Sequence, residues 1–287
     1  MGPEFSSANA PRFLGVDHVE FAVADVDSAS DIHHRLGFVR VATREIRERR
    51  LKSYRLVSGG LSVVLSQSRL DTDPIAVAVA KHGDGMFSLG FLCQDALSTL
   101  ERMHQRNGQV VEAPRTVQLG EAAQSQTQAQ VIAFGHVRHT LVSRSGGPFL
   151  EGFPSMPATA PVGFGIERAI GWTAFVEPAQ FPTVSAHYAA LLGLTRRPDG
   201  DDDNDEHHCR WTTSDGSLIP EMWSPSAPHD RVQEFLDVNH GSGVGEVALV
   251  APKREETIAR IIGAGLSVEA KTGLTAPIAG MLRYRIV

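Results

Sequence analysis

The chain repeats a pattern of glycines and apolar runs at long range. His82-Gly83-Asp84-Gly85 precedes an apolar run, and His240-Gly241-Ser242-Gly243 precedes a second apolar run 158 residues later. Three further landmarks recur at nearly the same spacing: Leu36-Gly37-Phe38 with Leu192-Gly193-Leu194, Gly60 with Gly216, and Gly108 with Gly265. A repeat of this length predicts that one supersecondary unit is built twice. It constrains the architecture more than any local motif does.

The hydrophobic pattern of the first repeat predicts the order β-α-β-β-β, twice over. Strands are expected at 16–23, 51–57 and 61–65, with a helix that ends at Gly37. A strand at 87–92, a helix that closes at Gly108, strands at 110–111 and 131–142, and a closing segment at 149–153 complete the unit. The second repeat follows the same scheme up to 281–287, a segment that we match with the penultimate strand. The sequence therefore predicts that the closing strand of the second unit is missing.

Length and composition indicate two globular domains. A chain of 287 residues is long enough for two domains of about 100–150 residues. We predict a flexible, tag-like N-terminus at 1–13, a first module at 14–153, a linker rich in Pro, Ala and Gly at 154–165, and a second module at 166–287. No apolar stretch approaches the roughly 18 residues that span a membrane, and the N-terminus does not resemble a signal peptide. We expect a cytoplasmic protein without a membrane partner.

Charge and cysteine content narrow the class of partner. The net charge is −6 and no sustained basic stripe is present, which disfavours nucleic acid. The two cysteines fall in different repeats, so they predict neither a disulfide framework nor a metal-ligand pair. The acidic run at 199–206, with two histidines after it, favours a solvated loop over a metal site. A small molecule is the expected partner.

Motifs along both repeats resemble those of a known enzyme family. They are, in the first repeat, Gly15–Ala22 (GVDHVEFA), Tyr54-Arg55 before a glycine-turn hairpin, His82-Gly83 and the helix that ends at Gly108, and, in the second, Ile166–Gly171 (IERAIG), Asp215–Pro220 (DGSLIP), Gln233–Leu236 (QEFL) and His240–Leu249 (HGSGVGEVAL). In order and spacing they resemble the two domains of 4-hydroxyphenylpyruvate dioxygenase, of the vicinal oxygen chelate (glyoxalase/bleomycin resistance/dioxygenase) superfamily. The resemblance implies an α+β fold of tandem modules, each a pair of βαβββ units whose curled mixed sheet forms an open cup.

The same resemblance implies an iron site in the second cup, and the chain departs from it. The family holds Fe(II) with two histidines and one carboxylate. The first histidine position falls on Arg168 by motif or near Ala174 by repeat spacing, and 166–176 contain no histidine. The second falls on Glu246, and the third ligand falls beyond the last residue. A guanidinium stays protonated and does not bind metals. We therefore expect no cofactor, and an ion pair of Arg168 with Glu246 in the vacated site.

Other side chains of the second cup are candidates for chemistry. Glu221 is a possible second inward carboxylate, and with Glu246 it would form an acid–base pair whose burial raises one pKa toward neutrality. Arg168 would bind a substrate carboxylate. Trp172 and Trp223 would line a pocket for an aromatic ligand, although large apolar residues on such strands are more often core. Strand alternation also allows Glu246 to point outward into solvent.

Three functions follow from these residues. The leading hypothesis is a diverged 4-hydroxyphenylpyruvate dioxygenase-like enzyme that acts on a small aromatic or 2-oxo acid metabolite without the iron triad. The second is a binding or self-resistance protein that sequesters a small molecule without chemistry. The third is an oxygenase with a rearranged site in the first module, in which His18 and Glu151 hold Fe(II) or another divalent metal. The missing strand would leave an exposed sheet edge, so a homodimer is expected.

Overall fold

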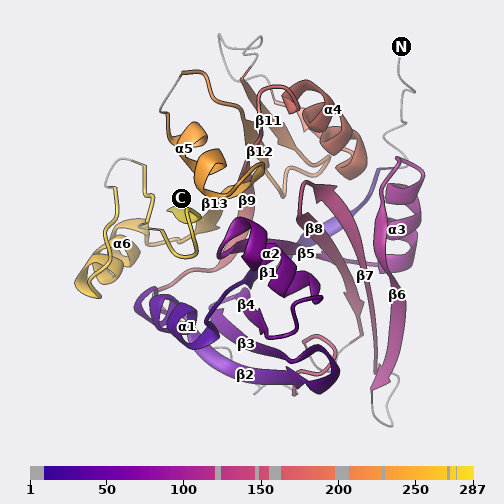
Figure 1. Cartoon of the computed structure of the whole chain (residues 1–287), viewed down its shortest axis with the longest axis horizontal. Coiled ribbons are helices and arrows are strands. Elements are labelled where there is room, and N and C mark those ends of the chain that lie inside the picture. The colour runs from indigo at the N-terminus through magenta and orange to yellow at the C-terminus, as the bar shows by residue number, and fades with distance from the viewer. Residues whose placement is uncertain are drawn as a thin grey trace.

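Two mixed β-sheets organise the molecule. The computed structural model describes residues 10–119, 124–145, 149–154, 163–197, 207–227, 230–269, 272–275 and 277–287. Module one contains an eight-stranded sheet of order β2-β3-β4-β1-β5-β8-β7-β6, and module two a six-stranded sheet of order β10-β11-β12-β9-β13-β14. Figure 1 shows the first sheet in indigo to magenta and the second from salmon to yellow. The predicted α+β fold of tandem modules is confirmed.

Module one follows the predicted double β-α-β-β-β order. Its elements are β1 Phe13–Ala22, α1 Val26–Arg35, β2 Val39–Ile46, β3 Leu51–Ser58, β4 Leu61–Ser68, α2 Pro74–His82, β5 Gly85–Cys93, α3 Ala96–His104, β6 Val110–Leu119, β7 Gln124–Phe134 and β8 Val137–Arg144. The segment 131–142, predicted as one strand, is instead divided between β7 and β8. Gly135 makes the turn with a φ of +53°, which favours glycine.

Aspartates fix where several helices begin. The side chains of Asp25, Asp95 and Asp230 each accept hydrogen bonds from main-chain N–H groups of the first turn. Asp73 does the same for α2, with Pro74 in the first turn. α2 is absent from the elements predicted above, because its sequence PIAVAVAKH is apolar on most of its surface and shows no helical alternation of polar and apolar residues. Its buried residues Ile75 and Ala78 pack against the sheet at the mouth of the cup.

Module two repeats the scheme with a shorter sheet. Its elements are β9 Arg168–Phe175, α4 Phe181–Leu192, β10 Thr195–Arg196, β11 His208–Thr212, β12 Glu221–Trp223, α5 Arg231–Val238, β13 Gly243–Val250, α6 Arg254–Gly263 and β14 Arg283–Ile286. β14 pairs in parallel with β13, as β8 pairs with β5. β14 therefore corresponds to β8, which overlaps the segment 131–142 that the sequence matched with it. The segment 149–153, expected to close module one, lies outside the sheet.

The outer edge of β14, whose exposure was the reason to expect a homodimer, is partly covered. Leu274 forms a bridge with Arg285 on the outer side of β14, and the N–H of Thr275 donates to the carbonyl of Tyr284. The homodimer stays a prediction.

The backs of the two sheets share one hydrophobic core. Phe91 of β5 packs on Trp172 of β9, with ring centroids 5.6 Å apart. Two buried histidine–tyrosine contacts cross the junction: His139 Nε2 lies 2.9 Å from the Tyr188 hydroxyl, and the Tyr284 hydroxyl donates to His33 Nε2 at 3.2 Å, because His33 Nδ1 donates to the Ala29 carbonyl. Burial lowers the pKa of His139 to about 3 and that of His33 to about 4, so both imidazoles are neutral. Because the backs are joined, the two concave faces point away from each other.

Several predictions concern residues outside those that the structure describes. They are the N-terminal segment up to residue 9, the linker from 155 to 162 and the acidic run at 199–206. Within the described part of the chain, no helix is both long and apolar enough to span a bilayer.

Candidate functional site

The concave face of the module-one sheet encloses a polar cavity of about 540 Å³. His18 and Glu20 of β1 reach it from one side, and Arg138 and Thr140 of β8 from the other. β5 lies between them, and α2 covers one edge through Pro74 and Ile75. We call this cavity the module-one cup.

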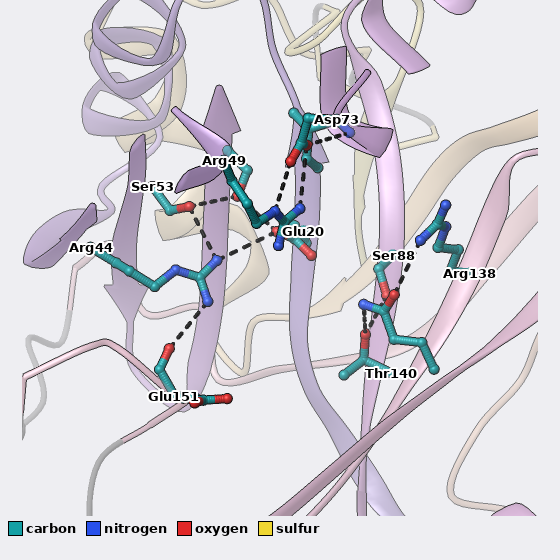
Figure 2. Close-up of polar contacts among 12 residues, drawn as sticks. Glu20, Arg44, Arg49, Ser53, Asp73, Ser88, Arg138, Thr140 and Glu151 are labelled. Carbon is teal, nitrogen blue, oxygen red and sulfur yellow. Dashed lines mark hydrogen bonds and ion pairs between the residues drawn. The ribbon is translucent and has the colours of Figure 1, made fainter. Parts of the chain in front are cut away.

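Hydroxyl and amide groups form the floor of the module-one cup. The register aligns Glu20 with Ser88 and Ser88 with Arg138 across three adjacent strands. The hydroxyls of Ser88 and Thr140 are 2.7 Å apart, and the Gln130 amide donates to Thr140 at 3.0 Å. The carbonyl oxygen of Gln130 accepts from Arg138 Nη1 at 3.3 Å. Figure 2 shows Arg138 beside the Ser88–Thr140 contact. The floor is therefore a connected hydrogen-bond network.

Arg138 is a half-buried cation of the cup that has no carboxylate partner. Among the residues that the structure describes, no Asp or Glu oxygen lies within 4.0 Å of its guanidinium. The group stacks on the Phe87 ring, 4.6 Å from the centroid. Burial lowers the pKa of Arg138, yet a guanidinium remains charged at neutral pH. A half-buried positive charge without an anion favours binding of one.

Two other arginines on the wall of the cup, Arg44 and Arg49, lie close to carboxylates. Arg49 forms two hydrogen bonds with the carboxylate of Asp73, at 2.7 and 3.3 Å. Arg44 donates to Ser53 and to the main-chain oxygen of Glu151, and it lies 4.0 Å from the Glu20 carboxylate. Figure 2 shows this group on the side of the cup opposite Arg138. Of the two remaining arginines that line the cup, Arg115 is exposed on β6, whereas Arg138 is half-buried.

His18 is held in one orientation by a carboxylate. A β-bulge between Val16 and His18 breaks the alternation of β1, so that Asp17 and His18 contact each other. His18 Nδ1 lies 2.8 Å from Asp17 Oδ2, and Arg144 binds both oxygens of Asp17 at 2.6 and 2.9 Å. Burial raises the pKa of Asp17, but His18 and Arg144 outweigh it and lower the pKa to about 2. Asp17 is thus an ionised acceptor at neutral pH.

Gly90 makes room for the His18 ring. A β-carbon at position 90 would lie 2.2 Å from Cε1 and 2.8 Å from Nε2 of His18. The ring therefore lies flat over the β5 backbone, with the Phe149 ring against it at a centroid distance of 5.5 Å. Any side chain at position 90 would displace the imidazole.

A second cavity of about 540 Å³ lies at the junction of the modules. Lys81 and His82 of α2, His136 of the β7–β8 turn and His240 of module two line it. The rings of His82 and His136 stack 3.9 Å apart, and burial lowers the pKa of His136 to about 4. Arg138 lines this cavity as well as the module-one cup.

In module two, ion pairs occupy the concave face. Arg285 of β14 lies between two buried carboxylates, 3.2 Å from Glu221 Oε1 and 3.8 Å from Glu246 Oε2. Arg231 forms an ion pair with Glu246, and Arg210 binds Glu221 at 3.1 Å. Burial raises the pKa of Glu221, but His208 and the arginines outweigh it and lower the pKa to about 2. We call Arg210, Glu221, Arg231, Glu246 and Arg285 the module-two ion network.

The structure brings together some of the predicted site residues of module two. Glu246 and Glu221 both face the concave side, at 3% and 5% exposure, so Glu246 is not an outward, solvated residue. Trp223 also lies there, stacked on His208 with ring centroids 3.9 Å apart. The pKa of Glu221 is lowered, against the expectation that burial would raise a carboxyl pKa toward neutrality.

Two other predicted residues lie elsewhere. Arg168 is exposed at the start of β9 and pairs in register with Val250, four residues beyond Glu246. Arg231 and Arg285, not Arg168, supply the charges at Glu246. Trp172 is 1% exposed in the core between the modules, where it cannot contact a ligand on the concave face.

The residues present do not fit the family's iron. The register places Thr173 beside Glu246, and Glu246 beside Arg283, on the three central strands of module two. This set offers one hydroxyl, one carboxylate and a guanidinium, which differs from two histidines and a carboxylate. In module one, His18 and Glu151 both line the cup, but the Glu151 side chain is exposed and its main-chain oxygen accepts a hydrogen bond from Arg44. Within the described residues, no group of three or more His, Cys, Asp or Glu could hold a metal ion.

Sequence reasoning missed Arg138, Asp17 and Arg285. Asp17 precedes His18 directly, and period-2 alternation places neighbours on opposite faces unless a bulge intervenes. Arg138 and Arg285 occupy alternate positions on strands, but their spacing carries no motif. The repeat could have identified Arg138, because the 158-residue spacing relates Ser88 to Glu246 and Arg138 is aligned with Ser88 across β5 and β8.

Comparisons with known proteins find relatives in the family that the sequence resembles. Residues 17–124 match the family model described as the Glyoxalase/Bleomycin resistance protein/Dioxygenase superfamily. A 4-hydroxyphenylpyruvate dioxygenase from Neurospora crassa is 25% identical over 301 residues, covering 91% of this chain and 71% of the relative. A protein of the same name from Aspergillus fumigatus is 24% identical over 283 residues, covering 85% and 68%. The chain is similar to these enzymes along most of its length.

Solved structures show the same fold. A mutant of 4-hydroxymandelate synthase from Streptomyces coelicolor superimposes with a TM-score of 0.76 at 18% identity, covering 96% of this chain and 92% of that chain. A xylose isomerase-like TIM barrel/4-hydroxyphenylpyruvate dioxygenase fusion protein gives a TM-score of 0.72 at 18% identity, covering 99% of this chain and 50% of the fusion.

Proposed function

We propose that this 4-hydroxyphenylpyruvate dioxygenase-like protein of the glyoxalase/bleomycin resistance/dioxygenase superfamily binds a small aromatic 2-oxo acid in its module-one cup, without iron. The observation that carries the proposal is Arg138, a half-buried cation without a carboxylate partner among the described residues, which faces a cavity of about 540 Å³. A bidentate guanidinium is the usual partner of a carboxylate. The working site would then lie in module one, and not in the second cup as the sequence predicts.

The chemistry of the cup supports an aromatic acid in particular. The Phe87 ring lies under Arg138, and Ile75 and Leu51 line the same cavity, so the charge adjoins an apolar surface. The hydroxyl of Thr140 offers a hydrogen bond to a second oxygen of the ligand. The relatives are named for 4-hydroxyphenylpyruvate, whose carboxylate, 2-oxo group and aromatic ring match these three features.

The absence of iron from this proposal rests on the donor set of module two. Glu246 is already paired with Arg231 and Arg285, and Arg285 also binds Glu221. A metal cation would have to displace guanidinium groups and would find no imidazole at the central strands. We therefore assign the module-two ion network to stability.

Acid–base catalysis by Glu246, Glu221 and Arg168 in module two receives less support. The pKa of Glu221 is lowered to about 2, so its carboxylate is a weak base at neutral pH. Arg168 is exposed and lies beside Val250. Loss of activity in Glu246→Gln with retained folding would return this alternative to first place.

Calorimetric titration with phenylpyruvate tests the proposed ligand class. Charge-assisted hydrogen bonds contribute about 1.5–3 kcal/mol, so Arg138→Gln should weaken binding by about 10- to 150-fold. Arg138→Lys keeps the positive charge but loses the planar guanidinium that can donate two hydrogen bonds to one carboxylate, so we expect an intermediate affinity. Arg283→Gln is the matched control, because Arg283 lies on the concave face of module two and pairs with the exposed Glu269.

The amide of phenylpyruvate sharpens the test. Without a carboxylate, the amide should bind wild type and Arg138→Gln with the same low affinity. Equal phenylpyruvate affinity in wild type and Arg138→Gln, or binding lost only in Glu246→Gln, would overturn the assignment to module one.

A further inference from the structure

We infer that His18 is a catalytic residue of the module-one cup, and that its Nε2 accepts a proton from the carbon next to the oxo group of a ligand held by Arg138. The inference rests on the proposed function and extends it from binding to keto–enol tautomerisation. It requires neither a metal nor an oxidant. Three observations support it: the fixed orientation of the His18 ring, the lack of a hydrogen-bond partner for its Nε2 among the described residues, and the position of His18 relative to Arg138.

Asp17 determines which nitrogen of His18 carries the hydrogen. Because Arg144 binds both oxygens of Asp17, that carboxylate is ionised and can only accept hydrogen bonds. The contact of 2.8 Å between Asp17 Oδ2 and His18 Nδ1 therefore requires a hydrogen on Nδ1. In the neutral imidazole, Nε2 then carries the lone pair, which is the form that a proton acceptor needs.

The Nε2 atom is buried and has no protein partner. His18 is 1% exposed, and its Nε2 makes no hydrogen bond with any described residue. The residue lines the module-one cup, and its ring is fixed between Gly90 and Phe149. A buried acceptor without a partner costs about 1–3 kcal/mol, so such groups are commonly satisfied by a ligand or by water.

The strand register places His18 and Arg138 at the two ends of a ligand-sized span. His18 is aligned with Gly90, and Arg138 with Ser88, on the two sides of β5. Two strand spacings separate β1 from β8 by about 10 Å, and two residues add an offset of about 7 Å along the strands. Both side chains extend into the cup and shorten this span. An aromatic 2-oxo acid whose carboxylate lies on Arg138 therefore extends across Ser88 toward His18.

The floor of the cup supplies a donor for the oxygen that gains charge. Ser88 and Thr140 have two O–H groups, and their mutual contact of 2.7 Å uses one of them. The Gln130 amide donates to Thr140 and does not consume the second O–H. That O–H remains available to the 2-oxo oxygen above it. A donor at this position stabilises an enolate more than the ketone.

The proposed step balances without a co-reactant. His18 Nε2 takes the proton from C3, the C–H electron pair becomes the C2–C3 π bond, and the carbonyl π pair moves to the 2-oxo oxygen. The imidazolium formed is offset by the Asp17 carboxylate 2.8 Å from Nδ1. Return of the proton to oxygen gives the enol, and return to C3 restores the ketone.

Exchange of the C3 hydrogens of phenylpyruvate with D₂O, followed by proton NMR, tests this step. Wild-type protein should accelerate exchange above the buffer rate. Positioned general bases contribute about 10²- to 10⁴-fold, so His18→Gln should lose at least about 100-fold of the protein-dependent rate. Its affinity for phenylpyruvate should stay within about threefold, because Arg138 is unchanged.

Two further measurements identify the role. Asp17→Asn should lower the exchange rate while retaining phenylpyruvate binding, and His82→Gln, at the junction cavity, should leave it unchanged. Prior dialysis against a chelator should also leave the rate unchanged, and a rate lost on chelation would overturn the metal-free step. Binding without accelerated exchange, or equal exchange in His18→Gln, would overturn this inference alone. Absence of phenylpyruvate binding would instead overturn the proposed function.

Discussion

The two concave faces are built on the same register and use their charges in opposite ways. In module one, Glu20, Ser88 and Arg138 lie side by side on the three central strands. In module two, the corresponding positions hold a hydroxyl, a carboxylate and an arginine: Thr173, Glu246 and Arg283. Each face thus has one acid, one hydroxyl and one guanidinium in a row, in different order.

The consequence for each face depends on whether its arginine meets a carboxylate. Arg285, two residues after Arg283, lies between Glu221 and Glu246, and its charge is satisfied within the protein. Arg138 has no such partner among the described residues and borders a cavity of about 540 Å³. Where the protein supplies a carboxylate, as at Arg285, the arginine of a concave face stabilises the fold. Where it supplies none, as at Arg138, the arginine can bind the anion of a ligand.

The largest expected effect is the loss of the central cation of module two. Arg285→Met leaves the buried Glu221 and Glu246 without their shared partner, and breaking a buried pair costs about 3–5 kcal/mol. Because both carboxylates retain another arginine, we expect the free energy of unfolding to fall by about 3 kcal/mol. Urea unfolding monitored by circular dichroism measures it.

Two substitutions control this experiment. Arg283→Met removes a pair with Glu269, which is 55% exposed, and should cost less than about 1 kcal/mol. Arg138→Met, at the register equivalent in module one, should likewise stay within about 1 kcal/mol. Equal losses for Arg285 and Arg138 would contradict the division of roles between the modules.

The next effect concerns the floor of module one. Gly90→Ala brings a β-carbon within 2.2 Å of the His18 ring, so the imidazole must leave its position. Overpacking of this kind costs about 1–3 kcal/mol, and the accelerated C3 exchange should disappear with it. Gly85→Ala, on the same strand, meets its first neighbour at 4.0 Å and should change neither stability nor exchange. Retained exchange in Gly90→Ala would show that the seating of His18 is irrelevant.

Acid should weaken both modules through one carboxylate each. Asp17 and Glu221 have pKa values lowered to about 2, from 3.8 and 4.5. Their stabilisation is therefore complete above about pH 5 and is lost as the pH falls toward 2, at no more than about 1.4 kcal/mol per pH unit for each group. Unfolding free energies between pH 6 and 3.5 should fall less steeply in Asp17→Asn and in Glu221→Gln. An unchanged slope in either variant would mean that its carboxylate is not ionised by its partners.

The smallest expected effect is that of iron. Binding of Fe(II) to the folded protein would raise the Tm. Because we expect no such binding, anaerobic addition of Fe(II) should leave the Tm unchanged. Elemental analysis after removal of free metal should find no stoichiometric iron. One iron per chain would show that a ligand set has formed around Glu246 or His18, and would restore the oxygenase hypothesis.

The architecture could be predicted because each unit is marked by glycine turns and strand periods, which are local signals, and because these marks recur in the second unit. The position of β14 was not predictable in the same way. Its sequence indicates a strand, but its parallel pairing joins it to β13, a strand far from it along the chain. Strand pairing is a tertiary choice that periodicity does not encode.

The candidate site was partly predictable for a related reason. Glu246 followed from the resemblance and Glu221 from its place on a predicted strand, and both are buried on the concave face of module two. The partner of Glu246 did not follow, since a motif alignment gives no cross-strand register and Arg168 pairs with Val250 instead. Asp17 was hidden by the bulge, which reverses the face that alternation assigns to it.

Arg138 borders both the module-one cup and the junction cavity, and this shared position makes the two cavities thermodynamically linked. An anion bound on either side would neutralise the charge on which the other side depends. Each ligand would then lower the affinity of the other by the same factor, because coupling free energies are reciprocal. A competing anion in the histidine-lined junction would act as an antagonist of the cup without entering it.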